Sequence, residues 1–266
     1  MVPSNHCEAC AERPASCRTH PAYSLLVTFS STRPTRRLAS ALVAAMVLAV
    51  LTGCSTLLGT PTPAPGSPPA TTIESLLAQV AVVDSRPDAP GYERSCKAGD
   101  GCVFGPAWTD DYDGPGGHDG CGTRDNVLQL ALTDVQFRPG TNYCVVVAGS
   151  LNDPFTGSVL PFSKQNAGDV QIDHTCPLAA AWDMGAWQWP LDQRIRFAND
   201  ITYNLMAVSG PENQSKSDKT PSEWMPPNGA YHCYYAGRYL TVAVRYGLPV
   251  TAADRDVLTT VSNSCP

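Results

Sequence analysis

A carboxylate and an imidazole stand side by side at the end of a short apolar segment, as Asp173 and His174. Residues 170–172 alternate between apolar and polar side chains, which predicts a strand, and Pro177 keeps that strand from continuing. A carboxylate can bind a cation, and a neutral imidazole can take a proton from water. Because such pairs are common, a structural histidine is the default interpretation of this pair taken alone.

A second polar group follows another apolar segment further along the chain. Residues 204–208 predict a second strand, residues 209–211 a turn, and residues 212–219 the first turns of a polar helix. Two strands and a helix in this order would gather five side chains around one point: Asp173, His174, Asn204, Asn213 and Lys216. Such a set could bind one Mg²⁺-type ion, activate water and neutralise a phosphate.

Short segments around these residues carry a resemblance to a known family. They are 172–174, 177–178, 181–182, 197–200, 204–205 and 213–218, with further matches at 108–110, 121–124, 153–157 and 223–228. The combination resembles the HNH (His-Me finger) endonucleases, in particular the C-terminal nuclease domain of GmrSD-type restriction enzymes and its secreted actinobacterial relatives. The likeness covers about residues 92 to 265. It implies an α+β fold with a ββα-metal core, a small antiparallel sheet, flanking helices and disulfides.

The resemblance also implies a role for each matched side chain. His174 would be the general base, and Asp173 and Asn213 would coordinate one Mg²⁺ or Mn²⁺ ion. Asn204 would orient the His174 ring through a hydrogen bond, and Lys216 would offset charge on the phosphate. The implied activity is hydrolysis of phosphodiester bonds in nucleic acid, with DNA favoured over RNA and little sequence specificity.

Arg124 belongs to the matching segment 121–124, and two roles for it stay open. Its guanidinium could clamp a phosphate in a bidentate manner, or it could fix its loop through an ion pair. The chain has no P-loop and no dinucleotide fingerprint, so no nucleotide cofactor is expected. We expect a monomer.

Charge limits how nucleic acid could be bound. The chain carries a net charge of −6, and five Arg and two Glu precede Cys54, so the remainder has 13 basic against 22 acidic residues. This balance argues against a long basic footprint and favours a compact, metal-dependent site. It also suits an alternative function, a non-catalytic cell-envelope lipoprotein that keeps the fold as a binding module.

The first part of the chain predicts export. Residues 1–37 are expected to be a disordered extension or the product of a start site placed too early. Residues 38–54 contain an apolar run, too short for a comfortable transmembrane helix, that ends in a lipobox-like Leu-Thr-Gly-Cys, so Cys54 would be lipidated. Residues 55–72 form a Pro/Thr-rich linker, and residues 73–266 form the nuclease-like domain. The expected location is extracytoplasmic, either anchored to the bacterial cell membrane by lipid or secreted.

Seven cysteines follow the lipobox, so at least one lacks an intramolecular disulfide partner. Counterparts in the resembling proteins imply the pairs Cys121–Cys144 and Cys233–Cys265. Cys96 and Cys102 flank a Gly-rich segment and could close a small loop, which leaves Cys176. A catalytic thiol at Cys176 is a third functional hypothesis, but no cysteine-hydrolase motif surrounds it, and a buried inert thiol is favoured.

The remaining elements are expected to frame the site. Helices are predicted at 73–83, 124–132, 178–187, 190–199, 231–246 and 251–261, and further strands at 135–137, 143–148 and 158–162.

Overall fold

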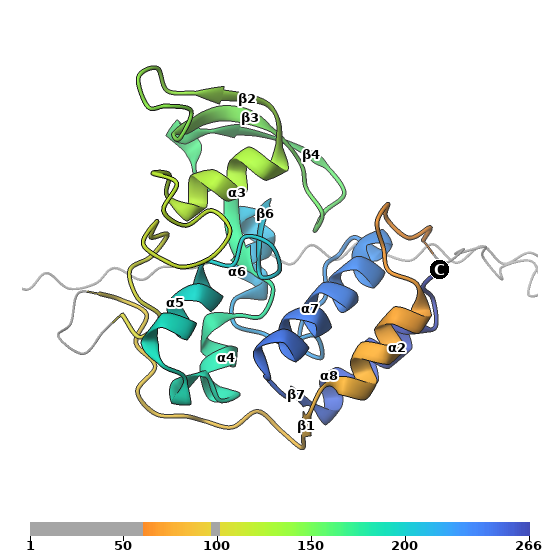
Figure 1. Cartoon of the computed structure of the whole chain (residues 1–266). Coiled ribbons are helices and arrows are strands. Elements are labelled where there is room, and N and C mark those ends of the chain that lie inside the picture. The colour runs from red at the N-terminus through yellow and green to blue at the C-terminus, as the bar shows by residue number, and fades with distance from the viewer. Residues whose placement is uncertain (1–60, 97–101) are drawn as a thin grey trace, which may run out of the picture. The chain divides into compact units, whose positions relative to one another are not determined.

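The computed structural model describes residues 61–96 and 102–266, which belong to one compact unit (Figure 1). Residues 1–60 and 97–101 lie outside the described residues. The predictions for the N-terminal extension, the signal segment and lipidation at Cys54 concern that part of the chain and stay predictions.

Two antiparallel strands and a short helix occupy the centre of the unit. Strand β5 (Val170–His174) pairs with β6 (Leu205–Ser209), with His174 opposite Leu205, and helix α6 (Gly210–Lys216) follows directly. Every residue of β6 is buried, which matches the apolar run 205–208 within it. The sequence order of strand, strand and helix therefore agrees with the expectation from residues 170–219.

The connection from β6 into α6 is tight because of two residues. A Cβ atom on Gly210 would lie 2.0 Å from the carbonyl oxygen of Gly168, so only glycine fits there. Pro211 occupies the first turn of the helix, where its missing N–H costs nothing. The helix ends after Lys216, where Ser217 adopts a φ of 53°. The side chains of α6 are thereby held close to β5.

A second sheet covers one side of this pair. Strands β2 (Leu132–Phe137), β3 (Val146–Asn152) and β4 (Val159–Ser163) are antiparallel in the order β2–β3–β4, and helix α3 (Thr123–Ala131) packs against β2, β3 and β6. One apolar cluster joins the sheet to the central pair through Val127, Leu128, Leu132, Val146, Leu151, Phe162, Val170, Ile172, Leu205 and Ala207.

A helical layer covers the other side (Figure 1). Helix α7 (His232–Tyr246) packs on α2 (Ala70–Gln79) and α8 (Ala252–Ser262). Strand β1 (Val82–Val83) pairs in parallel with β7 (Val250–Thr251) at the end of this layer. Its buried apolar residues continue through α4 and α5 to form the larger core of the unit.

Two short helices lie between β5 and β6 in the sequence. They are α4 (Leu178–Asp183) and α5 (Leu191–Ala198), and a 3₁₀ turn at Ala186–Gln188 separates them. Further 3₁₀ turns lie at Lys164–Asn166 and Gly229–Tyr231. The expected helix at 178–187 is therefore broken, because Gly185 takes a φ of 122°.

The predicted linker is wrong for residues 61–72. The N–H of Ala64 donates to the carbonyl of Ala230 at 2.7 Å, and α2 already begins at Ala70. Gly237 lets Pro68 approach α7 so closely that an added Cβ would lie 2.5 Å from the proline ring. The proline-rich segment thus turns at Gly66 and packs on a helix, where its composition predicts a tether.

The strand expected at 143–148 begins later, at Val146. Asn142 and Tyr143 have φ values of 49° and 60°, which an extended strand excludes. The cysteine that follows this turn is tied to Cys121. The turn therefore replaces the first residues of the expected strand.

The disulfide prediction is confirmed. The structure contains Cys96–Cys102, Cys121–Cys144 and Cys233–Cys265, and Cys176 is a free, buried cysteine. An α+β fold with small antiparallel sheets and disulfides is thus present. Within the described ranges, none of the helices has the length and apolar character needed to span a bilayer.

Candidate active site

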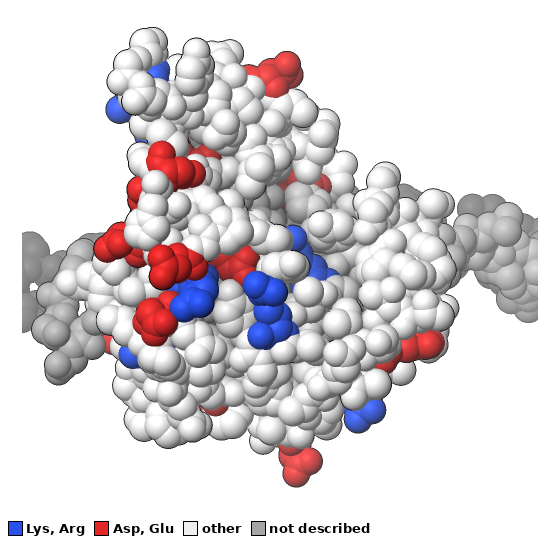
Figure 2. Space-filling view, in the orientation of Figure 1, with Lys and Arg blue, Asp and Glu red and all other residues white. Residues whose placement is uncertain are grey.

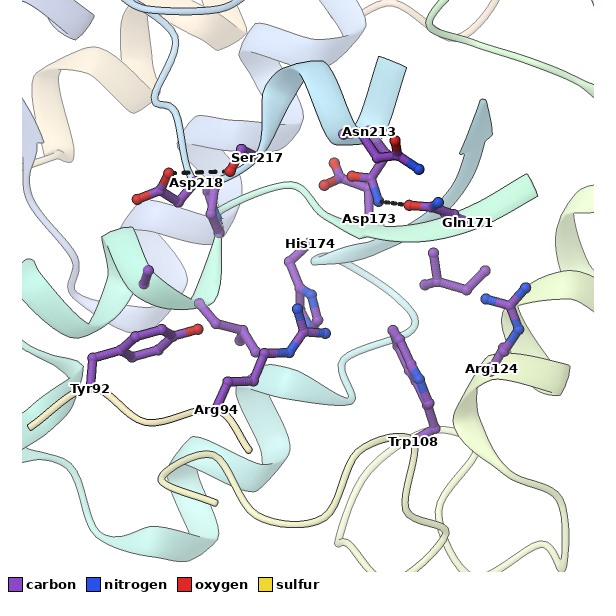
Figure 3. A pocket seen from close by; sticks show the side chains of 15 residues that line it. Tyr92, Arg94, Trp108, Arg124, Gln171, Asp173, His174, Asn213, Ser217 and Asp218 are labelled. Carbon is purple, nitrogen blue, oxygen red and sulfur yellow. Dashed lines mark hydrogen bonds between the residues drawn. The ribbon is translucent and has the colours of Figure 1, made fainter. Parts of the chain in front are cut away.

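An open cleft of about 800 Å³ runs along β5 and α6. Four of the predicted site residues line it, namely Arg124, Asp173, His174 and Asn213 (Figure 3). The other two, Asn204 and Lys216, are completely buried beneath its wall. The structure therefore brings the predicted set together but divides it into a group that faces the cleft and a group that supports it.

Lys216 supports the site through a buried ion pair. Its Nζ atom donates to Asp173 Oδ1 and to the carbonyl of His174, each at 2.8 Å. The Lys216 side chain is 0% exposed and that of Asp173 is 4% exposed. Burial raises the pKa of the Asp173 carboxyl, and Lys216 opposes this rise. Lys216 is expected from the sequence to offset charge on a phosphate, but its ammonium is enclosed and already bound to Asp173 and the His174 carbonyl, so it cannot contact a phosphate in the cleft.

Asn204 supports the backbone rather than the imidazole. Its Oδ1 accepts from the N–H of Cys176 at 3.0 Å, and its Nδ2 donates to the carbonyl of Phe197 at 3.2 Å. The expected hydrogen bond to the His174 ring is therefore wrong. Asn204 instead ties the segment after β5 to the end of α5, which is the helix that carries the true partner of the imidazole.

That partner is the carbonyl of Ala198, which lies 2.9 Å from His174 Nε2. Since a carbonyl can only accept, Nε2 carries the proton and Nδ1 holds the lone pair. The ring also stacks on Trp108, with centroids 5.8 Å apart and planes at 19°. Burial, with a smaller contribution from the positive charge of Arg94, lowers the pKa of His174 to about 3. The ring is therefore neutral at pH 7 and Nδ1 carries no proton, which is the protonation state that a general base needs before it acts.

Two oxygen atoms beside the imidazole could hold a cation. Asp173 Oδ2 is buried and has no hydrogen-bond partner. Asn213 Nδ2 donates to Gln171 Oε1 at 2.9 Å, which leaves Asn213 Oδ1 as an acceptor on the cleft wall (Figure 3). Hard oxygen donors suit Mg²⁺ or Mn²⁺, and Mg²⁺ commonly takes one or two protein ligands and completes its shell with water and phosphate oxygens. The donors present therefore fit such an ion.

The described part of the chain has no group of three or more His, Cys, Asp and Glu side chains placed to hold a metal. Any ion at Asp173 and Asn213 would thus depend on water or substrate for its other ligands. This arrangement differs from a structural metal site, in which protein side chains fill the whole shell.

Arg124 stabilises the start of β5. Its Nη2 donates to the carbonyls of Ala167 and Val170, both at 3.0 Å, and burial lowers the pKa of this half-buried guanidinium. These two carbonyl bonds take the place of the loop-fixing ion pair considered from the sequence. Because Arg124 also lines the cleft, the phosphate-clamp alternative stays a prediction.

Sequence reasoning missed three residues of the cleft, Tyr92, Arg94 and Trp108. The segment 91–121 is rich in Gly and Asp, so the sequence predicts only a loop there. Trp108 did fall in a matching segment, 108–110, and that was the available signal. Arg94 had no local signal, because its place beside His174 depends on how the loop folds back over the central strands.

Cys176 does not contribute chemistry. It is buried, its Sγ lies 3.7 Å from the carbonyl of Tyr239, and burial raises the pKa of its thiol. It is also absent from the lining of the cleft. These observations contradict the hypothesis of a cysteine-dependent hydrolase.

Comparison with known proteins gives two matches. Residues 122–261 match the family described as GmrSD restriction endonucleases, C-terminal domain, a range that contains all six predicted site residues. The chain is also 37% identical over 224 residues to a protein of Arthroderma benhamiae named "Uncharacterized secreted protein", and the alignment covers 82% of this chain and 98% of that protein. No solved structure matches the chain.

The buried ion pair yields a prediction about stability. Lys216→Met should lower the free energy of unfolding by about 3–5 kcal/mol, because it leaves Asp173 as an uncompensated buried carboxylate. Chemical denaturation at neutral pH, followed by circular dichroism, measures this loss. Adding Asp173→Asn should recover much of it. The control is Lys219→Met, which removes an exposed ammonium bound to the carbonyl of Ser215; equal losses for the two lysine variants would contradict the assignment.

The imidazole yields a prediction about protonation. Because the pKa of His174 is lowered to about 3, its ring should stay neutral as the pH falls from 8 to 5. An unperturbed histidine would become protonated around pH 6.5 over the same range. Long-range ¹H–¹⁵N spectra should show a proton on Nε2 only. An imidazolium spectrum for His174 at pH 6 would contradict the lowered pKa, and a neutral ring with its proton on Nδ1 would show that the Ala198 carbonyl does not set the tautomer.

Proposed function

Because this chain belongs to the family of GmrSD restriction endonuclease C-terminal domains, we propose that it is an HNH-type endonuclease that hydrolyses phosphodiester bonds in nucleic acid. One observation carries the proposal: a neutral imidazole and a buried carboxylate with an unpaired oxygen occupy consecutive positions on one strand and line an open cleft. The order β5, β6, α6 around them supports the proposal of a ββα-metal core.

His174 acts on the attacking water. Its Nδ1 accepts a proton as the water oxygen bonds to phosphorus, and the bond from phosphorus to the leaving oxygen breaks. The resulting imidazolium keeps its Nε2–H donated to the Ala198 carbonyl, a bond that strengthens when the ring becomes positive. The stack on Trp108 limits rotation of the ring, so Nδ1 stays aimed along one direction.

Asp173 and Asn213 hold the cation in this proposal. A Mg²⁺ or Mn²⁺ ion at Asp173 Oδ2 and Asn213 Oδ1 would polarise the scissile phosphate and stabilise the leaving oxygen. The protein keeps Asp173 ready for this role, since Lys216 engages Oδ1 and leaves Oδ2 without a partner. Gln171 holds the amide of Asn213 so that its oxygen remains available.

The proposed substrate and location follow from charge and family. An acidic chain with a compact site suits weak, sequence-tolerant binding of nucleic acid, and we favour DNA over RNA. The similarity to a protein named as secreted supports export. We further propose a monomer outside the cytoplasm, either lipid-anchored at Cys54 or released.

The proposed base is tested by His174→Gln. Glutamine keeps an N–H donor for the Ala198 carbonyl but has no basic nitrogen, so nicking of supercoiled plasmid in Mg²⁺ should fall by about 10²–10⁴-fold. The assay uses purified chain from residue 55 onward, with and without chelator. The control is His232→Gln, because His232 Nε2 bonds to the carbonyl of Pro226 at 2.8 Å without lining the cleft. Full activity in the His174 variant, or in wild type with chelator, would refute the mechanism.

The proposed cation ligand is tested by Asn213→Ala. Removing Oδ1 should raise the Mg²⁺ concentration for half-maximal nicking by about tenfold or more. Gln171→Ala is the matched control, since it removes the partner of Asn213 Nδ2 but no oxygen of the proposed site, and it should shift the titration less. Superimposable Mg²⁺ titrations for wild type and Asn213→Ala would eliminate Asn213 as a ligand.

A further inference from the structure

Three basic side chains lie in or beneath the cleft, and they differ in the protein groups to which they donate hydrogen bonds. Lys216 is enclosed and donates to Asp173 and to the His174 carbonyl, and Arg124 donates to two backbone carbonyls. Arg94 is exposed and lines the same cleft, and within residues 61–96 and 102–266 no hydrogen bond or ion pair of its guanidinium is found. Figure 3 shows this guanidinium directed toward His174.

Arg94 also borders a smaller hollow on the same side of the site. Trp108, His174 and Ala198 line that hollow with it, so the arginine lies along the imidazole and its hydrogen-bond partner. Figure 2 shows a few Lys and Arg side chains near the centre of the face that it draws, with Asp and Glu side chains mostly at the left of them. A free cation is thus available where a substrate would approach the base.

The backbone that carries Arg94 is braced on both sides. The Cys96–Cys102 disulfide closes the loop after it, and Val103 N donates to the carbonyl of Glu93 at 3.1 Å. Tyr92 packs against Trp182, with ring centroids 6.3 Å apart. The backbone position of Arg94 is therefore fixed by the fold, and its exposed guanidinium has no hydrogen bond or ion pair within the part of the chain that the structure describes.

Nearby carboxylates are engaged elsewhere. Asp218, which lines the cleft, pairs with Arg86 at 3.0 Å. Glu93, the neighbour of Arg94 in sequence, accepts from the N–H of Ser95 at 2.8 Å. An arginine on a braced loop, without an acidic partner and beside a proposed base, has the charge and the bidentate donor geometry that a phosphate requires.

We propose that Arg94 is the phosphate-binding cation of this cleft and holds a backbone phosphodiester of the nucleic acid against the His174 side of the site. The identity of the ligand rests on the proposed endonuclease function. Since Lys216 is enclosed and Arg124 Nη2 already donates to two carbonyls, the cleft offers few cations to phosphate, and its binding of nucleic acid should depend only weakly on salt.

The test measures binding separately from cleavage. A short fluorescent single-stranded oligonucleotide is titrated with the chain from residue 55 onward in the presence of chelator, over a range of salt concentrations. Arg94→Ala should weaken binding by about tenfold or more and reduce the slope of log K against log salt by about 0.7, the value for one lost contact to a single strand. Arg94→Lys keeps the charge, so it should retain the slope while losing part of the affinity.

The control is Arg255→Ala, which removes an exposed arginine of α8 that does not line the cleft. It should leave both affinity and slope unchanged. The thermal midpoint of Arg94→Ala should equal that of wild type, because its side chain supports no other residue. In Mg²⁺, Arg94→Ala should also lower kcat/KM for plasmid nicking, with recovery in Arg94→Lys.

The outcomes separate the two proposals. If binding depends on Arg94 but the wild type does not cleave, the phosphate site stands and the endonuclease function fails. If the wild type cleaves while the salt slopes of wild type and Arg94→Ala superimpose, the function stands and the role of Arg94 is overturned. If the wild type neither binds nor cleaves, both proposals are overturned.

Discussion

A buried pair between an ammonium and a carboxylate holds the site together. Lys216 on α6 reaches under the cleft to Asp173 on β5, and the same Nζ atom binds the carbonyl of His174. One lysine thus fixes the helix, the proposed cation ligand and the backbone of the proposed base relative to each other. Removing both charges from water costs free energy, so the pair adds little net stability. Its main effect is to hold α6 and β5 in a fixed relative position.

The enclosure of this pair also determines the state of the neighbouring groups. Asp173 keeps a charge-compensated carboxylate with one oxygen unpaired, and His174 stays neutral because a charged ring would be poorly solvated. The Ala198 carbonyl then selects which nitrogen carries the proton. Burial thus leaves His174 Nδ1 as a proton acceptor and Asp173 Oδ2 as a proposed cation ligand on consecutive residues.

The sequence predicted the parts of this site that depend on local pattern. Alternation at 170–172, the apolar residues of 204–208 and the polar run at 212–219 correctly indicate two strands followed by a helix, although α6 begins two residues earlier and ends at Lys216. Family resemblance adds which polar residues matter and implies Cys121–Cys144 and Cys233–Cys265, and the Gly-rich segment between Cys96 and Cys102 indicates the third disulfide. These features depend on neighbouring residues or on recognisable motifs, so they can be predicted from a single sequence.

Contacts between distant segments could not be predicted in the same way. The polar run 212–219 suggests a solvated helix, and only the fold shows that Lys216 faces inward. Asn204 has the expected chemistry, but its partners lie at Phe197 and Cys176, so its bonds depend on how α5 meets the end of β5. Arg94 lies in a loop, and the loop sequence does not predict that this residue is placed beside His174.

Both the net charge of the chain and the charges near the cleft limit how strongly nucleic acid can be attracted. The acidic composition disfavours broad attachment to nucleic acid, and Lys216 and Arg124 are already bound to protein groups. Little attraction is then left to hold a substrate before reaction. An enzyme of this kind would depend on preorganised groups that act on the phosphate in the transition state rather than on tight binding of the ground state. The imidazole held by the Ala198 carbonyl and the Asp173 carboxylate held by Lys216 meet that requirement, since the fold fixes both before a substrate arrives.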